Sequence, residues 1–442
     1  MDSYVPLDDS LKTFRSHSHV LKTQGNYLER SLGFFACKKV LTTFNANVLT
    51  KGLEKLPTPS TSPSPSSRRI LLVPNHRSCI DPVIVHYVLT LAGHPQPRVA
   101  ALDFIASTPL APLFKKCGAI FIKGDWKSPN YRTKMNDQFK AITDAGEWLE
   151  FYLEGARSTS GKQLDPRHGL FTALMSDRPC AIYPINISYE RLIEDREFVV
   201  KKKGFQLKST IQSLFVPGKG IGNVYFTVGD PIYTEPNHKP PHVALTVSRE
   251  IMKLNVIHGS DLIACILLDS QEHIPFSDLE RDMEWLQQAL RHRGIQVDAF
   301  SLSHTLKSLR HCITLKKGIV RIRDKTLLIY YRNRMIYTIS DLASTPSLLR
   351  KEALWTPDHG TRLRDNSRLK QIAKRAMEPT IFLYKYLLDK IQEGTVSVKE
   401  LRESIQDSPH CCFETVTNFL TVLKEDGVLT ISSADKDVII LS

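Results

Sequence analysis

The stretch RILLVPNHRSCIDPVIVHYVLTLAG, residues Arg69 to Gly93, decides the fold class. Its first five residues form a short apolar run, which predicts a buried strand. Its last twelve residues begin with Pro and end with Gly, which predicts a helix with Pro at its first position. The segment PNHRSCID (Pro74 to Asp81) therefore forms a strand-to-helix loop, and this order is typical of an α/β domain.

The chain continues this alternation of short apolar runs and helical patterns to about residue 260, and then becomes mainly helical. A helix is predicted between Asn130 and Gly146, a second between Asp278 and Gly294, and a hairpin-like stretch over Ile319–Tyr331. Further strands are predicted over Cys117–Asp125, Trp148–Gly155, Cys180–Ser188 and Asn223–Tyr233. We expect an α/β fold, a mixed sheet flanked by helices, with an N-terminal helical segment and a mainly helical C-terminal region.

Composition divides the chain into four parts. Residues 1–56 form an N-terminal helical segment, because apolar residues recur at helical spacing at Leu28, Leu32 and Phe35 and again at Leu41, Phe44 and Val48. This stripe is expected to pack on its own protein more readily than on a membrane. Residues 57–68 are a Pro/Ser linker, 69–260 the α/β domain, and 261–442 a mainly helical region whose end has the helix–helix–hairpin order of a winged helix.

The charge balance favours anionic partners. The 442 residues carry a net charge of +13, which suits phosphorylated small molecules, an anionic membrane surface or nucleic acid without choosing among them. The eight cysteines show no zinc-ligand spacing, so reduced thiols and no metal are expected. No run approaches the ~18 apolar residues of a spanning helix, so any membrane contact should be peripheral. The N-terminus predicts no signal peptide, and the C-terminal ILS is not the peroxisomal Ser-Lys-Leu signal.

His76 and Asp81 are the first candidate functional pair. On a helix, two residues five positions apart would point roughly 140° away from each other, so they act together only in a turn. Asp81 precedes the helix-starting proline, at the position of an N-cap carboxylate. From there it can accept a hydrogen bond from the His76 imidazole and leave the other ring nitrogen as a base. The residues alone also allow a purely structural histidine and a capping aspartate.

Other polar residues follow strand ends in the same way. Ligands of open α/β sheets bind beyond the carboxyl ends of the strands. Lys123 closes a second predicted strand, and Arg157 and Ser158 follow a third, so these groups suit a phosphate at that edge. No G-x-S-x-G nucleophile motif is present, and Cys79 is interpreted as a spacer. The simplest chemistry is a base that activates a substrate hydroxyl for direct attack on an ester or thioester.

At this point the sequence resembles the glycerolipid acyltransferases. NHRSCID is similar to block I of that family, the motif with four residues between histidine and aspartate. The other three blocks follow in the same order and spacing, as GAIFIK (Gly118–Lys123), FYLEGARS (Phe151–Ser158) and AIYPINISYERL (Ala181–Leu192). VYFTVGDPI and YYRNRMIY (Tyr330–Tyr337) resemble downstream segments of the glycerol-3-phosphate and dihydroxyacetone-phosphate acyltransferases, so the resemblance covers about residues 69–340.

The resemblance implies a specific reaction. His76 would be the general base and Asp81 its orienting partner, and the primary hydroxyl of a phosphorylated three-carbon acceptor would attack the thioester of acyl-CoA or an acylated carrier protein. No cofactor or metal is implied, because acyl-CoA is a co-substrate. The resemblance also implies substrate-binding residues, with an acyl-donor or positioning role for the last: Phe121, Lys123, Glu154, Gly155, Arg157, Ser158 and Pro184.

The sequence departs from the family pattern in two places. Block II of this branch usually ends in arginine, whereas Lys123 is followed here by Gly124, and lysine lacks the bidentate fork. A further basic residue often follows block III, but STSG stands here. Phosphate binding then has a further candidate in the lysine run 201–203, although a solvated loop is the expectation for that run.

Several alternatives stay open at this level. Glycerol-3-phosphate and dihydroxyacetone phosphate differ only at carbon 2, and the PINISYERLIED and VYF segments favour the dihydroxyacetone-phosphate enzymes narrowly. A lysophosphatidic acid acyltransferase shares the His/Asp motif, and a catalytically silent basic membrane-binding protein needs neither residue. Nucleic acid is not an expected partner. Peripheral association with a peroxisomal, endoplasmic-reticulum or mitochondrial membrane is expected, with the organelle undecided.

Overall fold

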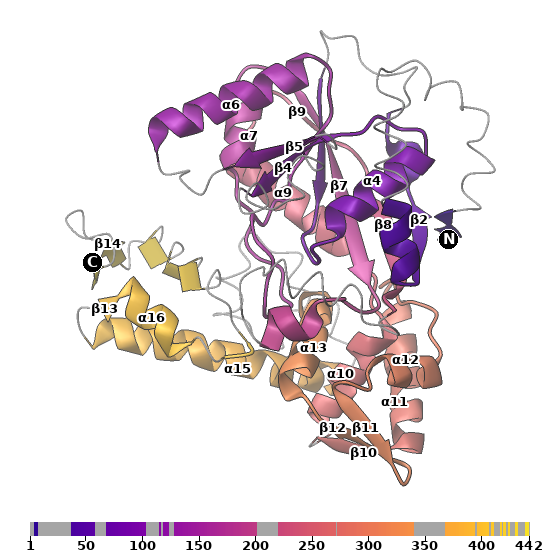
Figure 1. Cartoon of the computed structure of the whole chain (residues 1–442). Helices are drawn as coiled ribbons and strands as arrows, with labels where there is room; N and C mark the ends of the chain where they lie inside the picture. Colours follow the sequence, from indigo (N-terminus) through magenta and orange to yellow (C-terminus); the bar gives the residue numbers. More distant parts are fainter. Residues whose placement is uncertain are drawn as a thin grey trace. The chain divides into compact units, whose positions relative to one another are not determined.

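The computed structural model shows two compact units, drawn as one ribbon in Figure 1 and each described by itself. The first contains residues 1–155, 166–193 and 205–255, and the second contains 156–165, 194–204 and 256–442. The structure describes residues 4–7, 37–57, 68–102, 115, 118–122, 128–200, 220–270, 272–339, 367–393, 396–405, 408–410, 416–417, 419–420, 423–424, 429–431 and 438–441.

The first unit is built on a mixed sheet of nine described strands, ordered β1-β2-β8-β7-β3-β6-β4-β5, with β9 paired to β7. β3 lies near the centre, parallel to both β7 and β6, whereas β7 runs antiparallel to β8 and β9. The carboxyl ends of β3, β6 and β7 therefore meet at one edge of the sheet. The strands are β1 Val5–Pro6, β2 Ala46–Lys51, β3 Arg69–Pro74, β4 Arg98–Leu102, β5 Ala119–Ile122, β6 Leu149–Glu150, β7 Cys180–Tyr189, β8 Gly222–Val228 and β9 Ile232–Thr234.

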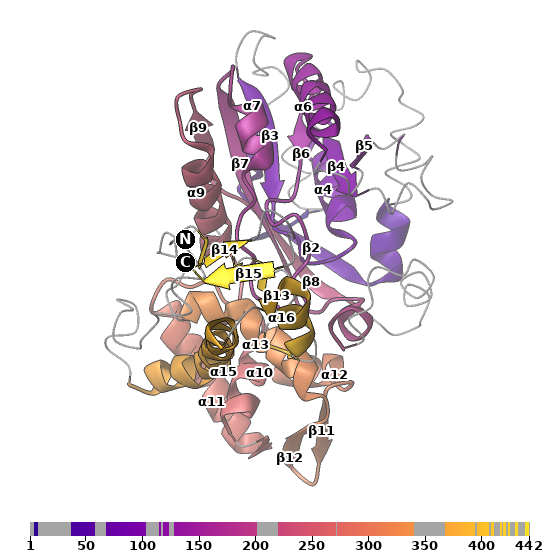
Figure 2. The ribbon, with the colours of Figure 1, turned by 90° about the vertical axis from the view of Figure 1, so that its left-hand side faces the viewer.

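Helices cover both faces of this sheet, which explains the continuous burial of β3. Leu71 and Val73 face a core shared with α6 (Pro129–Asp144), α7 (Gly169–Leu174) and α9 (Pro240–Lys253). Side chains alternate along a strand, so Ile70 and Leu72 face the other way. α4 (Asp81–Leu91) lies on that second side, as Figure 2 shows with α9 and α4 on either side of β3 and β7.

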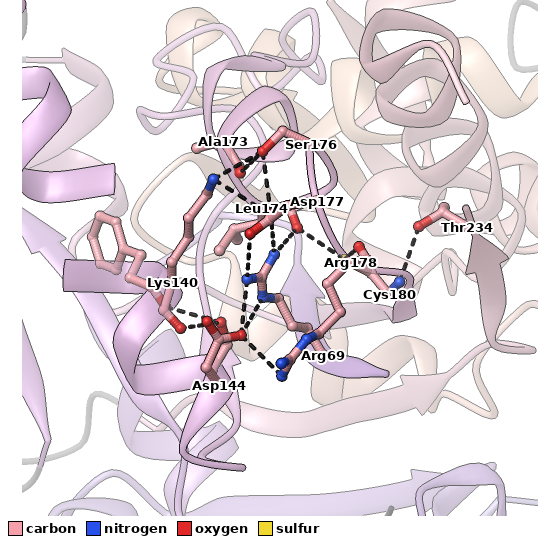
Figure 3. Close-up of polar contacts among 12 residues, drawn as sticks. Arg69, Lys140, Asp144, Ala173, Leu174, Ser176, Asp177, Arg178, Cys180 and Thr234 are labelled. Carbon is pink, nitrogen blue, oxygen red and sulfur yellow. Dashed lines mark hydrogen bonds and ion pairs between the residues drawn. The ribbon is translucent and has the colours of Figure 1, made fainter. Parts of the chain in front are cut away.

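A buried arginine fixes the amino end of β3 (Figure 3). The guanidinium of Arg69 donates to Asp144 at the end of α6, to Asp177, and to the carbonyl oxygen of Leu174. Its distances to the two carboxylates are both 2.8 Å. Arg69 holds the pKa of Asp177 below its usual range through this hydrogen bond. The strand that leads to the His76 loop therefore starts from a rigid anchor.

The second unit is mainly helical, as predicted. α10 (Gly259–Asp269) is buried and packs along α13 (Lys325–Ile339). The other elements are the π-helix Arg196–Val200, α11 Phe276–Arg291, α12 Leu302–Ser308, α15 Ser367–Gln392, α16 Val398–Ser404, β10 His273–Pro275, β11 Ile313–Lys316, β12 Ile319–Ile322, β13 Val396–Ser397, β14 Leu429–Ile431 and β15 Val438–Leu441. At the end of the chain, α16 and the antiparallel pair β14–β15 share a core with α15. Much of the segment between α16 and β14 lies outside the described residues, so the winged-helix order stays a prediction.

Two sequence predictions about secondary structure are wrong. The predicted N-terminal helix is present over residues 37–43, but Ala46–Lys51 is strand β2, which runs parallel to β8 from Ala46↔Gly222 to Lys51↔Thr227. Its backbone groups pair with a strand far along the chain, which local spacing does not report. The hairpin-like stretch is also misassigned: β11 and β12 turn at Lys317 and Gly318, both with positive φ, and the following residues form α13.

The remaining predicted elements of the α/β domain are present with shifted ends. The strand predicted over Trp148–Gly155 is reduced to β6, Leu149–Glu150, and β4 was not predicted. The rest of the predicted N-terminal helical segment and the Pro/Ser linker lie mostly outside the described residues. Among the helices of the described part, none has both the length and the apolar character to cross a membrane.

Candidate active site

The loop between β3 and α4 is fastened to the neighbouring strand β7. Asn75 is the first residue after β3, and its side-chain amide pairs with the backbone of Ile187 as a neighbouring strand would. Its Nδ2 donates to the carbonyl oxygen of Ile187 at 3.2 Å, and its Oδ1 accepts from the Ile187 N–H at 2.8 Å. Its backbone N–H also donates to the Ile185 carbonyl. The loop that carries His76 therefore begins at a fixed position at the carboxyl edge of the sheet.

Asp81 is the centre of the loop's hydrogen bonds. Its side chain is fully buried, and Oδ2 accepts from the backbone N–H groups of Arg77 at 2.7 Å and Ser78 at 2.9 Å. Oδ2 also lies 2.8 Å from His76 Nδ1, and Oδ1 accepts from the Tyr189 hydroxyl at 2.6 Å. The predicted hydrogen bond between the imidazole and the carboxylate is thus present, in a turn rather than on a helix.

The predicted N-cap role of Asp81 is wrong in detail. α4 begins at Asp81 itself, with Ile80 in the N-cap position and no side-chain cap. The carboxylate instead accepts N–H groups of the preceding turn, which curls the loop around it. This geometry brings His76 to Asp81 across the four intervening residues.

The contact with Asp81 determines the tautomer of His76. An ionised carboxylate only accepts hydrogen bonds, so Nδ1 carries the proton and Nε2 of the neutral ring carries the lone pair. The side chain is 20% exposed, and no hydrogen-bond partner of Nε2 is found within the described parts of the chain. Nε2 of His76 therefore presents a lone pair at the edge of the sheet where ligands of α/β folds bind.

Tyr152 and Glu150 support the His76 imidazole on one face of its ring. The Tyr152 ring stacks on the His76 ring with centroids 4.1 Å apart and planes at 28°. The Tyr152 hydroxyl donates to Glu150 Oε1 at 2.8 Å, and Glu150 is fully buried in β6. Burial, with the nearby charge of Asp81, raises the pKa of Glu150 to about 8, so this carboxyl group is mainly protonated at neutral pH. Burial also raises the pKa of Tyr152 well above its usual value.

Glu154 and Gly155 complete the loop environment in the first unit. Glu154 is buried, and its Oε1 accepts the backbone N–H of His76 at 3.2 Å. Gly155 has φ +66°, and a Cβ there would come within 2.7 Å of the Arg167 side chain. Only glycine adopts this conformation in this space without strain. Glu154 therefore helps to hold the His76 loop, and Gly155 allows the backbone conformation that follows it.

Arg157 and Ser158 belong to the second unit and form contacts there. The Arg157 guanidinium donates to Glu194 at 2.6 Å, with both side chains largely buried, and stacks over the Phe198 ring at 4.2 Å. Ser158 Oγ lies 3.0 Å from Ser160 Oγ. The charge of Arg157 is thus balanced by a carboxylate within its own unit.

The other predicted site residues are distributed differently. Pro184 is buried in β7 and registers with Val73, one residue before the end of β3. Phe121 lies on the edge strand β5, and three strand spacings of ~4.8 Å place that strand roughly 14 Å from β3. The structure therefore does not bring Phe121 against His76. Lys123, Gly124 and the lysine run 201–203 lie outside the described residues.

Three residues of the site were missed by sequence reasoning: Tyr152, Glu150 and Tyr189. Tyr152 and Glu150 were assigned to a strand without a role, although they precede the predicted Glu154 directly. Tyr189 is 108 positions from Asp81, and no local pattern signals that contact. Within the residues that the structure describes, no group of three or more His, Cys, Asp or Glu side chains is arranged to hold a metal ion.

Comparison with known proteins matches both units. Residues 47–188, which include every predicted site residue, match the family described as Acyltransferase. Residues 232–352 match the family described as Glycerol-3-phosphate acyltransferase C-terminal region. The region from β2 through β7 thus has the fold of an acyltransferase domain, and the residues after it resemble the C-terminal region of glycerol-3-phosphate acyltransferases.

Several curated proteins are similar to the chain in sequence. The chain is 25% identical over 332 residues to a glycerol-3-phosphate acyltransferase of Pseudoalteromonas atlantica, covering 62% of the chain and 40% of the relative. It is 25% identical over 319 residues to the enzyme of that name from Pseudomonas paraeruginosa (61% and 38%), and 26% identical over 328 residues to that from Pseudomonas putida (63% and 39%). The chain is thus similar to glycerol-3-phosphate acyltransferases over about three fifths of its length. It spans about two fifths of the length of these relatives.

Proposed function

We propose that the protein is an O-acyltransferase that moves a fatty acyl group from acyl-CoA to the primary hydroxyl of a phosphorylated three-carbon acceptor. The observation that carries this proposal is the 2.8 Å contact between His76 Nδ1 and the buried Asp81, which leaves Nε2 as a base. The names of the curated relatives favour glycerol-3-phosphate as the acceptor. Dihydroxyacetone phosphate, which the sequence favoured narrowly, presents a primary hydroxyl of the same kind.

The proposed step needs one base and no covalent enzyme intermediate. His76 Nε2 takes the proton of the acceptor hydroxyl while its oxygen attacks the thioester carbonyl carbon. The tetrahedral intermediate collapses, the carbon–sulfur bond breaks, and the thiol of CoA leaves with the proton returned by the imidazolium. The products are an ester and free CoA.

Asp81 supports this step in two ways. It fixes Nδ1 as the protonated nitrogen, and its negative charge stabilises the imidazolium that forms during attack. The hydrogen bonds from Arg77, Ser78 and Tyr189 hold the carboxylate in place, so the imidazole needs little reorganisation. Tyr152 restricts rotation of the ring from its face.

The test is thiol release from palmitoyl-CoA by the purified chain, with the wild-type protein and His76→Ala. Glycerol-3-phosphate, dihydroxyacetone phosphate and lysophosphatidate are supplied in separate reactions. We expect release that depends on a three-carbon phosphate and falls by about 1,000-fold or more in His76→Ala, the scale on which loss of a catalytic base acts. His242→Ala is the matched control, because His242 is an exposed histidine on α9 of the same unit.

The outcomes separate the alternatives. Equal turnover by His76→Ala and wild type would remove His76 from the chemistry. Turnover with lysophosphatidate alone would assign the protein to the acyltransferases of that second acceptor. A folded wild-type protein that releases no thiol with any acceptor, yet floats with anionic vesicles, would favour the silent membrane-binding protein. Peripheral membrane association is part of the proposal, since both the acyl donor and the product are amphipathic.

A further inference from the structure

A buried cation in the second unit, Arg332, has no carboxylate partner among the described residues. The side chain of Arg332, on α13, is 6% exposed. Its Nε and Nη2 donate to Asn333 Oδ1 at 3.3 Å and 3.0 Å, and Nη2 lies 3.5 Å from His410 Nδ1. Among the described residues, no carboxylate is paired with this guanidinium, in contrast to Arg157 with Glu194 and Arg334 with Asp261.

The guanidinium is held in place by neutral partners. Asn333 Nδ2 donates to the Ser160 carbonyl oxygen at 2.8 Å, so the amide that accepts from Arg332 is itself fixed. Gly161, next to Ser160, has φ +83°, and a Cβ there would come within 2.2 Å of the Tyr330 carbonyl oxygen. The segment around Ser160 is therefore pressed against α13, and the position of the guanidinium is set before any ligand binds.

The ionisable groups around Arg332 include two basic groups and a thiol. His410 lies 3.5 Å from the guanidinium, and Lys162, only 2% exposed, acts on the same imidazole. The buried Cys265 thiol acts on Arg332 itself. Burial, followed by the charges of Arg332 and Lys162, lowers the pKa of His410 to about 3, so its ring is neutral and accepts from the guanidinium. Burial lowers the pKa of Arg332 to about 10, which still leaves it charged at neutral pH. Proteins normally balance buried charge with an opposite charge, because the uncompensated ion is costly.

We propose that Arg332, supported by Lys162 and His410, binds the phosphate monoester group of a substrate. The two N–H groups of a guanidinium fork match two phosphate oxygens. A phosphate dianion would also supply the negative charge that the described residues do not place beside Arg332. The identity of the substrate rests on the proposed function: glycerol-3-phosphate and the 3′-phosphate of CoA are the two sources of this group. Arg157 is less suited to this task, because Glu194 already neutralises it.

The test measures binding directly, by calorimetry and by thermal shift of the full chain. The probes are glycerol-3-phosphate against glycerol, and CoA against dephospho-CoA, so that each pair differs only in the phosphate monoester. We expect one pair to show phosphate-dependent binding, which identifies the source. Arg332→Met should weaken that binding by at least about 10-fold, the scale of one hydrogen bond to a charged group. Arg310→Met, at an exposed arginine of the same unit, should bind as the wild type does.

A second readout separates a ligand-binding arginine from a structural one. Because Arg332 pairs with no carboxylate in the described part of the chain, the ligand-free Arg332→Met protein should melt at the wild-type temperature or above it. Its melting temperature should then fail to rise with the phosphate probe, whereas that of the wild type rises. Arg332→Lys keeps the charge without the fork, so it should fold normally and bind more weakly.

Wild-type affinity in Arg332→Lys, or absence of phosphate-dependent binding to the wild type, would overturn the proposal. The His76→Ala variant distinguishes this proposal from the proposed function. Arg332-dependent binding without acyl transfer would refute only the proposed function. Acyl transfer without Arg332-dependent binding would refute only the phosphate site.

Discussion

Glu150 gives the sharpest test of the physical account of the active site. It is fully buried in β6, accepts the hydroxyl of Tyr152, and lies near the negative charge of Asp81. Its Oε2 has no hydrogen-bond partner within the described residues. Since Oε1 is the acceptor for Tyr152, the proton of the neutral carboxyl group belongs on Oε2. We predict that Glu150→Gln, which keeps the shape and cannot ionise, stabilises the protein above acidic pH.

The magnitude follows from the pKa. Burial raises the pKa of Glu150 from 4.5 to about 8, so the folded state favours the protonated form. The stability that this proton contributes is complete below pH 4.5 and is lost as the pH rises through about 8. At 1.36 kcal/mol per pH unit, the loss amounts to about 3 kcal/mol at pH 7 and about 5 kcal/mol above pH 9, both as upper values. The glutamine variant avoids this loss.

Urea unfolding of wild type and Glu150→Gln at pH 4, 7 and 9 measures the difference. The two free energies of unfolding should be nearly equal at pH 4 and should diverge progressively in favour of the variant at pH 7 and 9. Glu147→Gln is the control, three residues earlier: its carboxylate is half-exposed and paired with Arg98 at 2.6 Å, so its effect should stay within about 1 kcal/mol. A glutamine variant that is less stable than wild type at pH 7, with a gap that does not change with pH, would refute a neutral Glu150.

Three further predictions concern the site and its anchor. Asp81→Asn should lower kcat by about 100-fold or more, with a smaller effect on KM, because the imidazole loses its fixed tautomer. Initial rates at varied acceptor concentration measure both constants. An unchanged kcat would show that Asp81 takes no part in the chemistry. Tyr152→Phe keeps the stacked ring and should retain most activity. Tyr152→Leu should reduce kcat by about 10-fold, because the His76 ring can then rotate more freely. Equal kcat values for the two variants would contradict the positioning role of Tyr152. Arg69→Met should cost ~3 kcal/mol in urea unfolding, because it leaves the Leu174 carbonyl without its donor and removes the buried cation between Asp144 and Asp177, which keep the more exposed Arg178 and Lys140 as partners. Active protein should keep its kcat.

The sequence predicted those parts of the fold whose signals are local. β3 and α4 were found because a run of apolar residues and the Pro/Gly punctuation lie within 25 residues of each other. β2 was missed because Leu41, Phe44 and Val48 fit a helical spacing, whereas the decisive partner, β8, lies more than 170 positions later. α13 was misread because most of its residues are buried, the polar Arg332 and Asn333 included, so no alternation of polar and apolar residues distinguishes this helix from a strand.

The candidate site likewise contains residues that local sequence signals predicted and residues that only the fold brings together. The His76–Asp81 pair was predictable, since both residues fall in one loop whose ends were marked by the strand and by Pro82. Tyr189 was not, because only the pairing of β7 with β3 brings its hydroxyl to Asp81. Glu150 was not either: its significance arises from burial, and burial in a strand of two residues depends on both neighbouring strands.

The residues of the motif FYLEGARS (Phe151–Ser158) do not all have the same role. Glu154 binds the backbone of the His76 loop, whereas Arg157, three residues later, pairs with Glu194 in the other unit, so the two charged residues of the motif each have a protein partner. A substrate phosphate would have to displace Glu194 in order to use Arg157, and would thereby leave a buried carboxylate unpaired. Binding at Arg332 avoids that cost, because the hydrogen-bond partners of this guanidinium within the described residues are an amide and an imidazole. The distribution of counter-ions, rather than the motif, therefore favours Arg332 as the phosphate ligand and leaves Arg157 a role in holding its unit together.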